Sequence, residues 1–214
     1  MDTEMESPWK VPPGYFGSGP ENIHVLKNFI EKDDVVTIAT FAKTISEWAN
    51  AKEENEYAED GTCTYDAAYW NNRQCSSTIL QRINPEIYAL IDHYIEKMAQ
   101  TINSLYNCRV SNRPPCIIRW FPGIEQRPHA DKQMNNGSPN PFTTYDINSL
   151  FYYNDDFEGG ELYYPQHDIT VKPEPGLAVF HPGDINYLHG VKMVTSGERY
   201  TTPAFYSVEE FLHE

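Results

Sequence analysis

The second half of the chain consists of short runs of β-favouring residues separated by turn residues, and this pattern restricts the fold more than any other feature. Val, Ile, Thr and aromatic residues fill the runs, and Gly, Pro, Asn or Asp stand between them. The runs are CIIRWF, NSLFYY, ELYYP, ITVK, LAVFHP, HGVKMV and RYTTPAFYSV. Short strands at regular spacing predict a β-sandwich or barrel. Pro203, inside the last run, indicates an edge strand or a bulge.

Two amphipathic helices are expected before these strands. Asp33 and Asp34 can cap a helix whose apolar residues follow three- and four-residue spacing as far as Ala49. Asn84, followed by Pro85, marks the start of a second helix with an apolar stripe about four turns long. A short strand is expected in ENIHVLKNFI, ahead of both helices. The sequence therefore predicts an α+β, mainly β fold with supporting helices towards its N-terminus.

A chain of 214 residues is long enough for one domain with a sizeable core. Residues 1–20 contain several Pro and Gly and are expected to form an irregular lead-in, so the domain is predicted to span residues 21–214. Two polar segments are expected to be loops. Residues 51–78 are interpreted as a mobile lid or a disordered connection, and residues 131–148 as a flexible, turn-rich loop.

The charge balance excludes several classes of partner. With 16 Lys and Arg against 31 Asp and Glu, the formal net charge of −15 disfavours nucleic acids and anionic membrane surfaces. The acidic N-terminus lacks the basic and apolar segments of a secretory signal, and no apolar run approaches a membrane span. A soluble, intracellular and cytoplasmic protein is predicted. Its cysteines are then expected to be unpaired thiols: Cys63, Cys75, Cys108 and Cys116.

His129 and Asp131, in RPHAD, are candidate metal ligands, because residues two apart on an extended segment point the same way. The pair alone proves little, since chance gives about one such pair in a chain of this composition. Two histidines and one carboxylate would leave positions open on an iron ion, as in non-haem Fe(II) oxygenases. His24, His93 and His213 are expected at the surface, which leaves as candidates for the second histidine His167, His181 and His189.

Five segments in a fixed order resemble the prolyl 4-hydroxylase-like family of 2-oxoglutarate- and Fe(II)-dependent dioxygenases, which includes procollagen-proline 4-dioxygenases. They are WFPGIEQRPHAD, YYND, FEGGELYYP, GLAVFHP and HGVKMVTSGERY, and the match runs from about Glu21 to Ser207. Each segment is a weak signal alone, but their order and spacing together form a strong one. The resemblance implies a double-stranded β-helix, or jelly roll.

The resemblance also assigns roles to residues. His129, Asp131 and His189 would bind Fe(II), and Arg199 would hold the far carboxylate of 2-oxoglutarate. Tyr152 would contact the same carboxylate, with Thr201 as a weaker alternative. Gly159 and Gly160 are interpreted as turn residues, and by the same comparison His167 and His181 are not ligands.

The implied reaction hydroxylates a prolyl residue of a peptide or protein and converts 2-oxoglutarate and O₂ to succinate and CO₂. Ascorbate is a possible additional cofactor, and no catalytic residue is assigned beyond the iron site. Trp70, Trp120 and Arg127 are proposed to contact the substrate. Trp120 stands where many relatives have a tyrosine, and Gln126 replaces a frequent aromatic residue, so the pocket is expected to be remodelled.

Two alternatives stay open. The same iron site could hydroxylate another residue or a small metabolite, because the metal ligands do not define the substrate. The other alternative is a non-catalytic jelly-roll binding module. Such a module is expected to have lost a metal ligand or the basic residue that holds the cofactor, and this sequence retains all of them. Nucleic-acid demethylation is set aside, because no second arginine follows Arg199.

Overall fold

The computed structural model describes residues 7–49 and 70–212. Its helices are α1 (Lys32–Ala42), α3 (Ser77–Ile83) and α4 (Pro85–Tyr106). The main antiparallel sheet has the order β1 (His24–Leu26), β10 (Ala178–Pro182), β6 (Ile147–Tyr152), β13 (Arg199–Phe211), β4 (Ile117–Trp120) and β2 (Gln74–Cys75). A further strand, β3 (Cys108–Asn112), pairs with the far end of β13.

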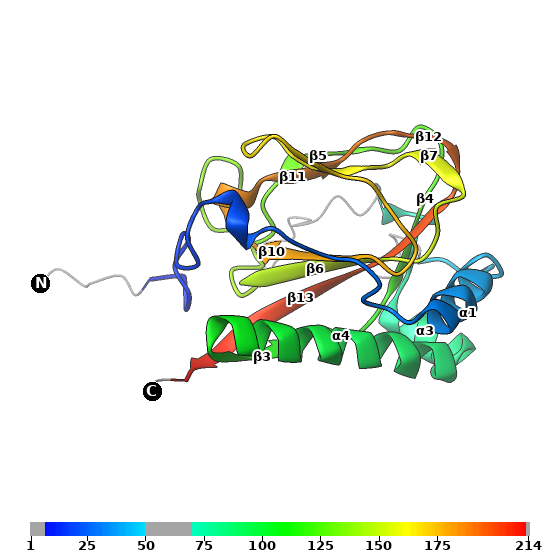
Figure 1. Cartoon of the computed structure of the whole chain (residues 1–214), viewed down its shortest axis with the longest axis horizontal. Helices are drawn as coiled ribbons and strands as arrows, with labels where there is room; N and C mark the ends of the chain where they lie inside the picture. Colours follow the sequence, from blue (N-terminus) through cyan, green and yellow to red (C-terminus); the bar gives the residue numbers. More distant parts are fainter. Residues whose placement is uncertain (1–6, 50–69, 213–214) are drawn as a thin grey trace, which may run out of the picture.

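A second sheet has the order β5 (Gln126–His129), β11 (His189–Val191), β8 (Leu162–Tyr164) and β9 (Ile169–Val171). Next to it β7 (Phe157–Gly159) pairs with β12 (Val194–Gly197). Figure 1 shows three layers: α4 runs along one face of the main sheet, and the second sheet lies over the other face. Every strand pair in both sheets is antiparallel.

Strand β6 illustrates why the main sheet is apolar on both faces. Phe151 belongs to the core cluster that includes the stripe of α4, whereas Tyr152 belongs to a second cluster with residues of β8 and β9. Successive side chains of a strand point to opposite faces, so a sheet between two layers is buried on both sides. Leu150 and Tyr152, two residues apart on this strand, both pack in the second cluster.

The predicted second helix is confirmed, and the first is shorter than predicted. Helix α4 starts at Pro85, and the side chain of Asn84 accepts a hydrogen bond from the Ile87 N–H at 3.0 Å. Helix α1 has Glu31, not an aspartate, at its N-cap, and it ends at Ala42 instead of continuing to Ala49. The Thr44 hydroxyl bonds the Phe41 carbonyl at 2.7 Å, which is the kind of local side-chain contact that competes with helix continuation.

All seven predicted runs contain strands, and HGVKMV is divided between β11 and β12. The sequence did not predict β3, β7 or α3 as separate elements. The expectation of one loop over residues 51–78 is wrong at its end, where β2 and the start of α3 lie, and residues 51–69 lie outside the described part. In the 131–148 loop, Lys132 and Asp146 form a buried ion pair at 2.5 Å, so both ends of this loop are anchored.

Pro203 does not lie on an edge strand, because β13 has neighbours on both sides. The pairing of β13 with β4 ends at Thr201, and the pairing of β13 with β3 begins at Tyr206. Pro203 falls between these two registers and faces Leu150 of β6 on the other side. The missing N–H of proline is tolerated where the strand changes partner.

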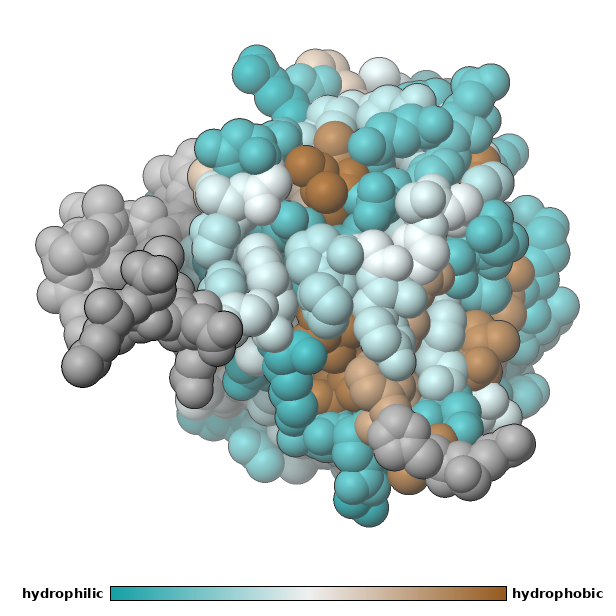
Figure 2. Space-filling view, turned by 90° about the vertical axis from the view of Figure 1, so that its left-hand side faces the viewer, coloured by the Kyte–Doolittle hydropathy of each residue, from teal (hydrophilic) through white to brown (hydrophobic). Residues whose placement is uncertain are grey.

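The N-terminal lead-in packs against the fold even though residues 7–19 form no helix or strand. Val11 is buried, and the Gly14 N–H donates to Asp184 at 2.8 Å. Cys108 and Cys116 are free and buried, as predicted, Cys75 is buried, and Cys63 lies outside the described residues. No helix of the described part is long and apolar enough to cross a membrane. The face in Figure 2 is mainly hydrophilic, with hydrophobic residues visible in small patches.

Candidate metal centre and cofactor pocket

The pairing of β11 with β5 places the two predicted histidine ligands side by side. His189 lies directly opposite His129 in the register, and their ring centroids are 4.5 Å apart. Asp131 follows β5 by two residues, with one carboxylate oxygen 3.6 Å from His129 Nε2 and the other 3.4 Å from His189 Nε2. Ligand atoms of the three residues lie within 4.8 Å of one another. The structure therefore brings together the predicted metal-binding residues His129, Asp131 and His189, which are called the metal triad below.

Each of the two histidines is oriented by its other ring nitrogen. His129 Nδ1 lies 3.0 Å from the Arg127 carbonyl, and His189 Nδ1 lies 3.1 Å from the Tyr187 carbonyl. A carbonyl can only accept, so in the neutral rings Nδ1 carries the hydrogen and Nε2 has a lone pair that is available to a metal ion beside Asp131. Such contacts to the second nitrogen are typical of histidines that bind metals.

The carboxylate of Asp131 is fixed from the main sheet. The Asn148 side-chain amide, on β6, donates to Asp131 Oδ2, and the Asp131 backbone N–H donates to the Gly183 carbonyl at 3.1 Å. A β-carbon on Gly183 would lie 2.1 Å from the Tyr145 carbonyl oxygen, so this close approach requires glycine. The second sheet thus carries the two histidines, and the main sheet holds the carboxylate of Asp131 in place.

The electrostatics of the triad suit a cation. Burial alone would raise the pKa of Asp131, but His189 and His129 outweigh it and lower that pKa to about 2. Burial lowers the pKa of His189 to about 3, against the opposing effect of Asp131. Burial would also lower the pKa of His129, yet its contact with Asp131 gives a net increase. At neutral pH the carboxylate is ionised and His189 is neutral, which is the protonation state that metal binding needs.

The register of the main sheet assembles a second group of residues near the triad. Arg199 lies opposite Trp120 of β4, and Thr201 lies opposite Tyr152 of β6. The Arg199 guanidinium carbon is 4.9 Å from the Trp120 ring centroid and 5.1 Å from that of Tyr152. Thr201 accepts a hydrogen bond from the Trp120 indole at 3.3 Å. Arg199, Tyr152 and Thr201 are 0 % exposed, so an anion reaching this guanidinium would leave bulk water.

Gly159 and Gly160 have the turn role that was predicted, and Gly160 also makes room for Arg199. Their φ angles are +75° and +69°, a region that glycine tolerates best. A β-carbon on Gly159 would lie 2.0 Å from the Met193 carbonyl oxygen, and one on Gly160 would lie 2.9 Å from Arg199 Cδ. The GGEL turn therefore sets the depth at which the arginine sits.

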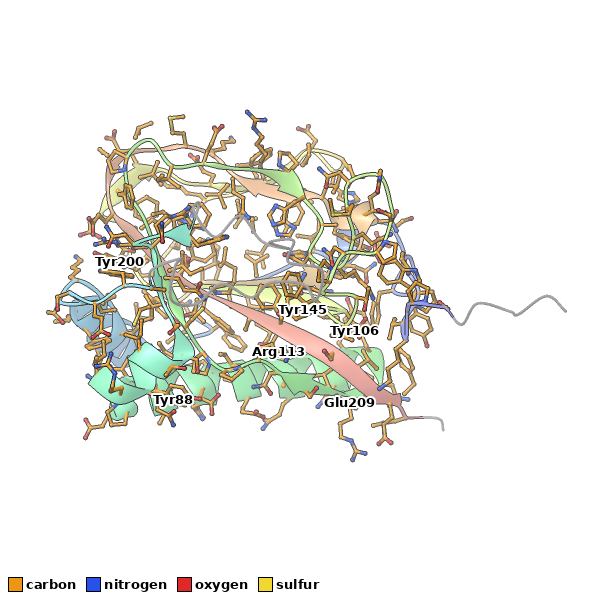
Figure 3. All side chains as sticks on the ribbon, turned by 180° about the vertical axis from the view of Figure 1, so that it is seen from behind. Tyr88, Tyr106, Arg113, Tyr145, Tyr200 and Glu209 are labelled. Atoms are coloured by element: carbon orange, nitrogen blue, oxygen red, sulfur yellow. The ribbon has the colours of Figure 1, made fainter. Side chains whose placement is uncertain are left out.

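A cavity of about 830 Å³ lies between the sheets, and the metal triad forms part of its wall. Trp70 and Trp120 also line it, with ring centroids 5.9 Å apart, and the buried Arg73 guanidinium packs on both rings. Further lining residues include Leu150, Leu162, Thr201, Met134, Phe142, Tyr145 and Phe205. Figure 3 shows Tyr145 and Arg113 close together, and the guanidinium lies 5.6 Å from the tyrosine ring.

One predicted substrate residue falls outside this cavity. The Arg127 side chain is exposed on β5 and does not line the wall, so a contact between this side chain and a molecule in the cavity does not fit the structure. In an antiparallel pair alternate side chains face away, and Arg127 alternates with the inward Gln126. Arg127 contributes through its backbone, because its carbonyl orients His129.

The remaining histidines occupy different environments, and one of them, His24, differs from the prediction. His181 was excluded as a ligand, yet it is buried beside the triad, with its ring centroid 4.5 Å from that of His189. His24, expected at the surface, stacks on Phe180 at 4.4 Å, and burial lowers its pKa. His93 is exposed as predicted, and His213 lies outside the described residues. His167 is held by the Asn186 carbonyl at 2.8 Å.

Four residues at the site were not assigned a role from the sequence. Gln126 was noted only as a departure from relatives, and its amide lies 3.2 Å from His129 Nε2. Asn148 and Arg73 lie in none of the five segments of the resemblance, and Tyr164 lies in FEGGELYYP without an assigned role. Two-residue periodicity places Tyr164 on the same face as Leu162, which is the one signal that the sequence offers for it. Asn148 and Arg73 approach the site only through the pairing of distant strands.

The geometry can be compared with known proteins. The viral collagen prolyl hydroxylase of Paramecium bursaria Chlorella virus-1, in its 2-oxoglutarate complex, has a TM-score of 0.58 and 17 % identity. The alignment covers 86 % of this chain and 95 % of that one. A Trichoplax adhaerens prolyl hydroxylase, in complex with a peptide fragment of the hypoxia inducible factor oxygen degradation domain, gives 0.55 and 16 %, covering 89 % and 85 %. The chain has the fold of these prolyl hydroxylases.

Sequence similarity is limited to part of the chain. Prolyl 3-hydroxylase 2 of Rattus norvegicus is 32 % identical over 81 residues, which are 36 % of this chain and 12 % of that protein. The chain thus matches about an eighth of the length of this relative. No protein-family model matches the sequence. The resemblance to prolyl hydroxylases therefore has support in both sequence and fold.

Proposed function

We propose that the chain is a 2-oxoglutarate- and Fe(II)-dependent dioxygenase that hydroxylates prolyl residues in a peptide or protein. The observation that carries the proposal is the convergence of His129 Nε2, His189 Nε2 and the Asp131 carboxylate within 4.8 Å on the wall of one cavity. Two imidazoles and one carboxylate are the donor set of non-haem Fe(II) oxygenases. The resemblance in fold to prolyl hydroxylases gives independent support.

His129, Asp131 and His189 would hold Fe(II), and Arg199 with Tyr152 would hold the far carboxylate of 2-oxoglutarate. A buried guanidinium can form a two-pronged, charge-assisted contact with a carboxylate. Bound iron would supply the oxidising chemistry, with O₂ and 2-oxoglutarate as co-substrates. The chain's own residues orient the ligands through the Arg127 and Tyr187 carbonyls, keep Asp131 ionised and exclude water from the pocket.

Two observations support a prolyl substrate: the peptide bound by a structural neighbour, and the aromatic residues in the cavity wall. The Trichoplax neighbour is in complex with a peptide fragment. In this chain Trp70 and Trp120 line the cavity next to the triad, and such rings offer flat apolar surfaces to a proline ring. The sequence relatives are prolyl 3-hydroxylases, whereas the structural neighbours include prolyl 4-hydroxylases, so the ring carbon that reacts is left to product analysis.

The first test is anaerobic visible absorption with Fe(II) and 2-oxoglutarate. Chelation by the keto acid gives a metal-to-ligand charge-transfer band, which we expect in the wild type and not in His129→Ala. Arg199→Ala should weaken 2-oxoglutarate binding by at least about 100-fold, because it removes a buried charged contact. Arg127→Ala and His167→Ala are matched controls that should keep the band. No band in the wild type would refute the proposal and favour a binding module.

The second test identifies the product. Proline-rich peptides would be incubated with enzyme, Fe(II), 2-oxoglutarate and ascorbate, and the hydroxyproline isomer would be assigned after hydrolysis. Succinate formed together with one oxygen atom on proline is the expected result. Turnover of 2-oxoglutarate that responds to small metabolites and not to any prolyl peptide would support the alternative substrate class.

We further propose that residues 21–214 form one domain with the double-stranded β-helix topology. The two facing antiparallel sheets and the location of the triad between them support this assignment. Limited proteolysis should leave one protected core. An intracellular location stays a prediction from the sequence, and fluorescence microscopy of the tagged chain would check it.

A further inference from the structure

Tyr164 is a buried side chain at the site that the proposed function does not use. It lies at the end of β8, is 0 % exposed and packs in the same apolar cluster as Tyr152. Its ring centroid is 5.2 Å from that of His181 and 5.9 Å from that of His189. The side chain therefore connects the metal triad with the residues around Arg199.

The Tyr164 hydroxyl is buried and has no hydrogen-bond partner among residues 7–49 and 70–212. Three other buried tyrosine hydroxyls do have partners: Tyr153 with Thr202 at 2.8 Å, Tyr187 with the Gly19 carbonyl at 3.2 Å, and Tyr206 with Ser149 at 3.2 Å. The hydroxyl of Tyr152, the proposed contact of the cofactor carboxylate, is buried without a partner in the described part of the chain, as that of Tyr164 is. An unsatisfied buried hydroxyl destabilises a protein, and a core position could be filled by phenylalanine without that penalty. A bound molecule that accepts a hydrogen bond would therefore explain why a tyrosine, and not a phenylalanine, occupies this position.

The position of Tyr164 indicates where this partner lies. Leu150, Leu162 and Thr201 line the cavity. Each has a partner two residues away on its own strand, which is respectively Tyr152, Tyr164 or Arg199. Residues two apart share a strand face, so these three side chains extend the cavity wall towards its buried end. Burial, followed by the proximity of Tyr152 and Asp131, raises the pKa of Tyr164 well above its usual value. The hydroxyl is thus protonated and can donate.

We propose that Tyr164 donates a hydrogen bond to the far carboxylate of 2-oxoglutarate, beside Arg199 and Tyr152, and so acts as a third cofactor-binding residue. This inference rests on the proposed function. A dicarboxylate lying between Asp131 and the Arg199 end would satisfy the hydroxyl and be neutralised at one end by the guanidinium. The hydroxyl would then select a keto acid that has a second carboxylate over one that lacks it.

The test compares Tyr164→Phe with Tyr163→Phe, its neighbour on the opposite face of β8. Kd would be measured from the anaerobic charge-transfer band for 2-oxoglutarate and for 2-oxopentanoate, which has the same keto acid head and no far carboxylate. Tyr164→Phe should weaken 2-oxoglutarate binding by about 10- to 100-fold and leave 2-oxopentanoate unchanged, as expected for one hydrogen bond to a charged group. Tyr163→Phe should change neither.

A second readout separates a binding role from a structural one. Without ligands, Tyr164→Phe should melt at the wild-type temperature or above it, because it removes an unsatisfied buried oxygen. If Tyr164→Phe weakened the binding of both keto acids equally, or left 2-oxoglutarate binding unchanged, the inference would be overturned. The proposed function would still stand, because the wild type would show the charge-transfer band. A wild type without any band would instead defeat the proposed function itself.

Discussion

At the residue scale, the metal triad depends on neighbours that hold its donors in place. His129 and His189 each use Nδ1 to bind a backbone carbonyl, so their direction is set by β5 and by the turn before β11. Asp131 depends on a side chain from a different sheet, because Asn148 is on β6. Removing such supporting contacts typically reduces metal affinity without removing a ligand.

Asn148→Ala should therefore weaken metal binding by about 10- to 100-fold, because the Asp131 carboxylate loses its amide donor. The affinity for Mn(II) or Fe(II) can be measured by anaerobic calorimetry. Asn140→Ala is the matched control, since Asn140 donates to the Asp131 backbone carbonyl and not to the carboxylate. An unchanged affinity in Asn148→Ala would show that the carboxylate needs no such support.

His24 gives the molecule a pH-dependent stability. Its ring is stacked on Phe180, and burial lowers its pKa, so the folded state disfavours the charged form. Between the lowered folded pKa and the unfolded value of about 6.5, the unfolded chain binds more protons, and stability falls as pH falls. His24→Phe should lose less stability than the wild type between about pH 7.5 and about pH 5.5 in urea unfolding. Parallel losses in both proteins would contradict this.

At the element scale, α4, the longest helix of the described part, has a defined cap at its N-terminus. Asn84 caps α4 through the Ile87 N–H, and Pro85 occupies the first turn. This helix covers the face of the main sheet opposite the site, as Figure 1 shows, and its apolar stripe fills the larger core cluster. Its ends are therefore expected to affect global stability and not ligand binding.

Asn84→Ala should lower the free energy of unfolding by about 0.5–2 kcal/mol, because the first turn loses its side-chain cap. Asn84→Ser, which restores a capping oxygen, should recover most of this loss. Chemical denaturation of both variants gives the measurement, and the affinity for Mn(II) should stay at the wild-type value. A variant that lost metal binding while folded would show that α4 also positions the site.

At the scale of the whole molecule, a buried ion pair joins three distant segments. Lys132 Nζ contacts Asp146 at 2.5 Å and donates to the Val11 carbonyl at 2.8 Å, while Asp146 accepts from the Val208 N–H at 2.9 Å. Lys132 is next to Asp131, so the N-terminal lead-in and β13 are both tied to the start of the 131–148 loop, where Asp131 lies. Burying a charge without its partner is costly.

Lys132→Met should thus cost about 3–5 kcal/mol, since it leaves the Asp146 carboxylate buried and unpaired. The double variant Lys132→Met with Asp146→Asn should be less destabilised, because no uncompensated charge then stays inside. The free energy of unfolding of both variants can be measured by denaturant unfolding at constant pH. Equal losses in the single and double variants would mean that packing, and not charge, dominates at this position.

Which features the sequence could predict follows from the range of the interactions involved. Helix α4 and the strands of the second half depend on local periodicity and capping, so they were predicted, with β3 and β7 missed because they are short or carry weak patterns. Helix α1 ends at Ala42, and the Thr44 side chain beyond it bonds to the Phe41 carbonyl, a local contact that residue spacing does not reveal. His129, Asp131, His189 and Arg199 had roles implied by the motifs, whereas Asn148 and Arg73 lie outside the motifs and Tyr164 lies in one without an assigned role.

The sequence by itself determined the types of the elements and the chemistry of the donors, because both are properties of neighbouring residues. Only the tertiary structure decided which side chains meet: the register of β11 on β5 aligns the histidines, and the register of β13 between β4 and β6 buries Arg199 against Trp120 and Tyr152. Strand pairing joins residues far apart in the chain, and a shift of one residue would turn each of these side chains to the opposite face.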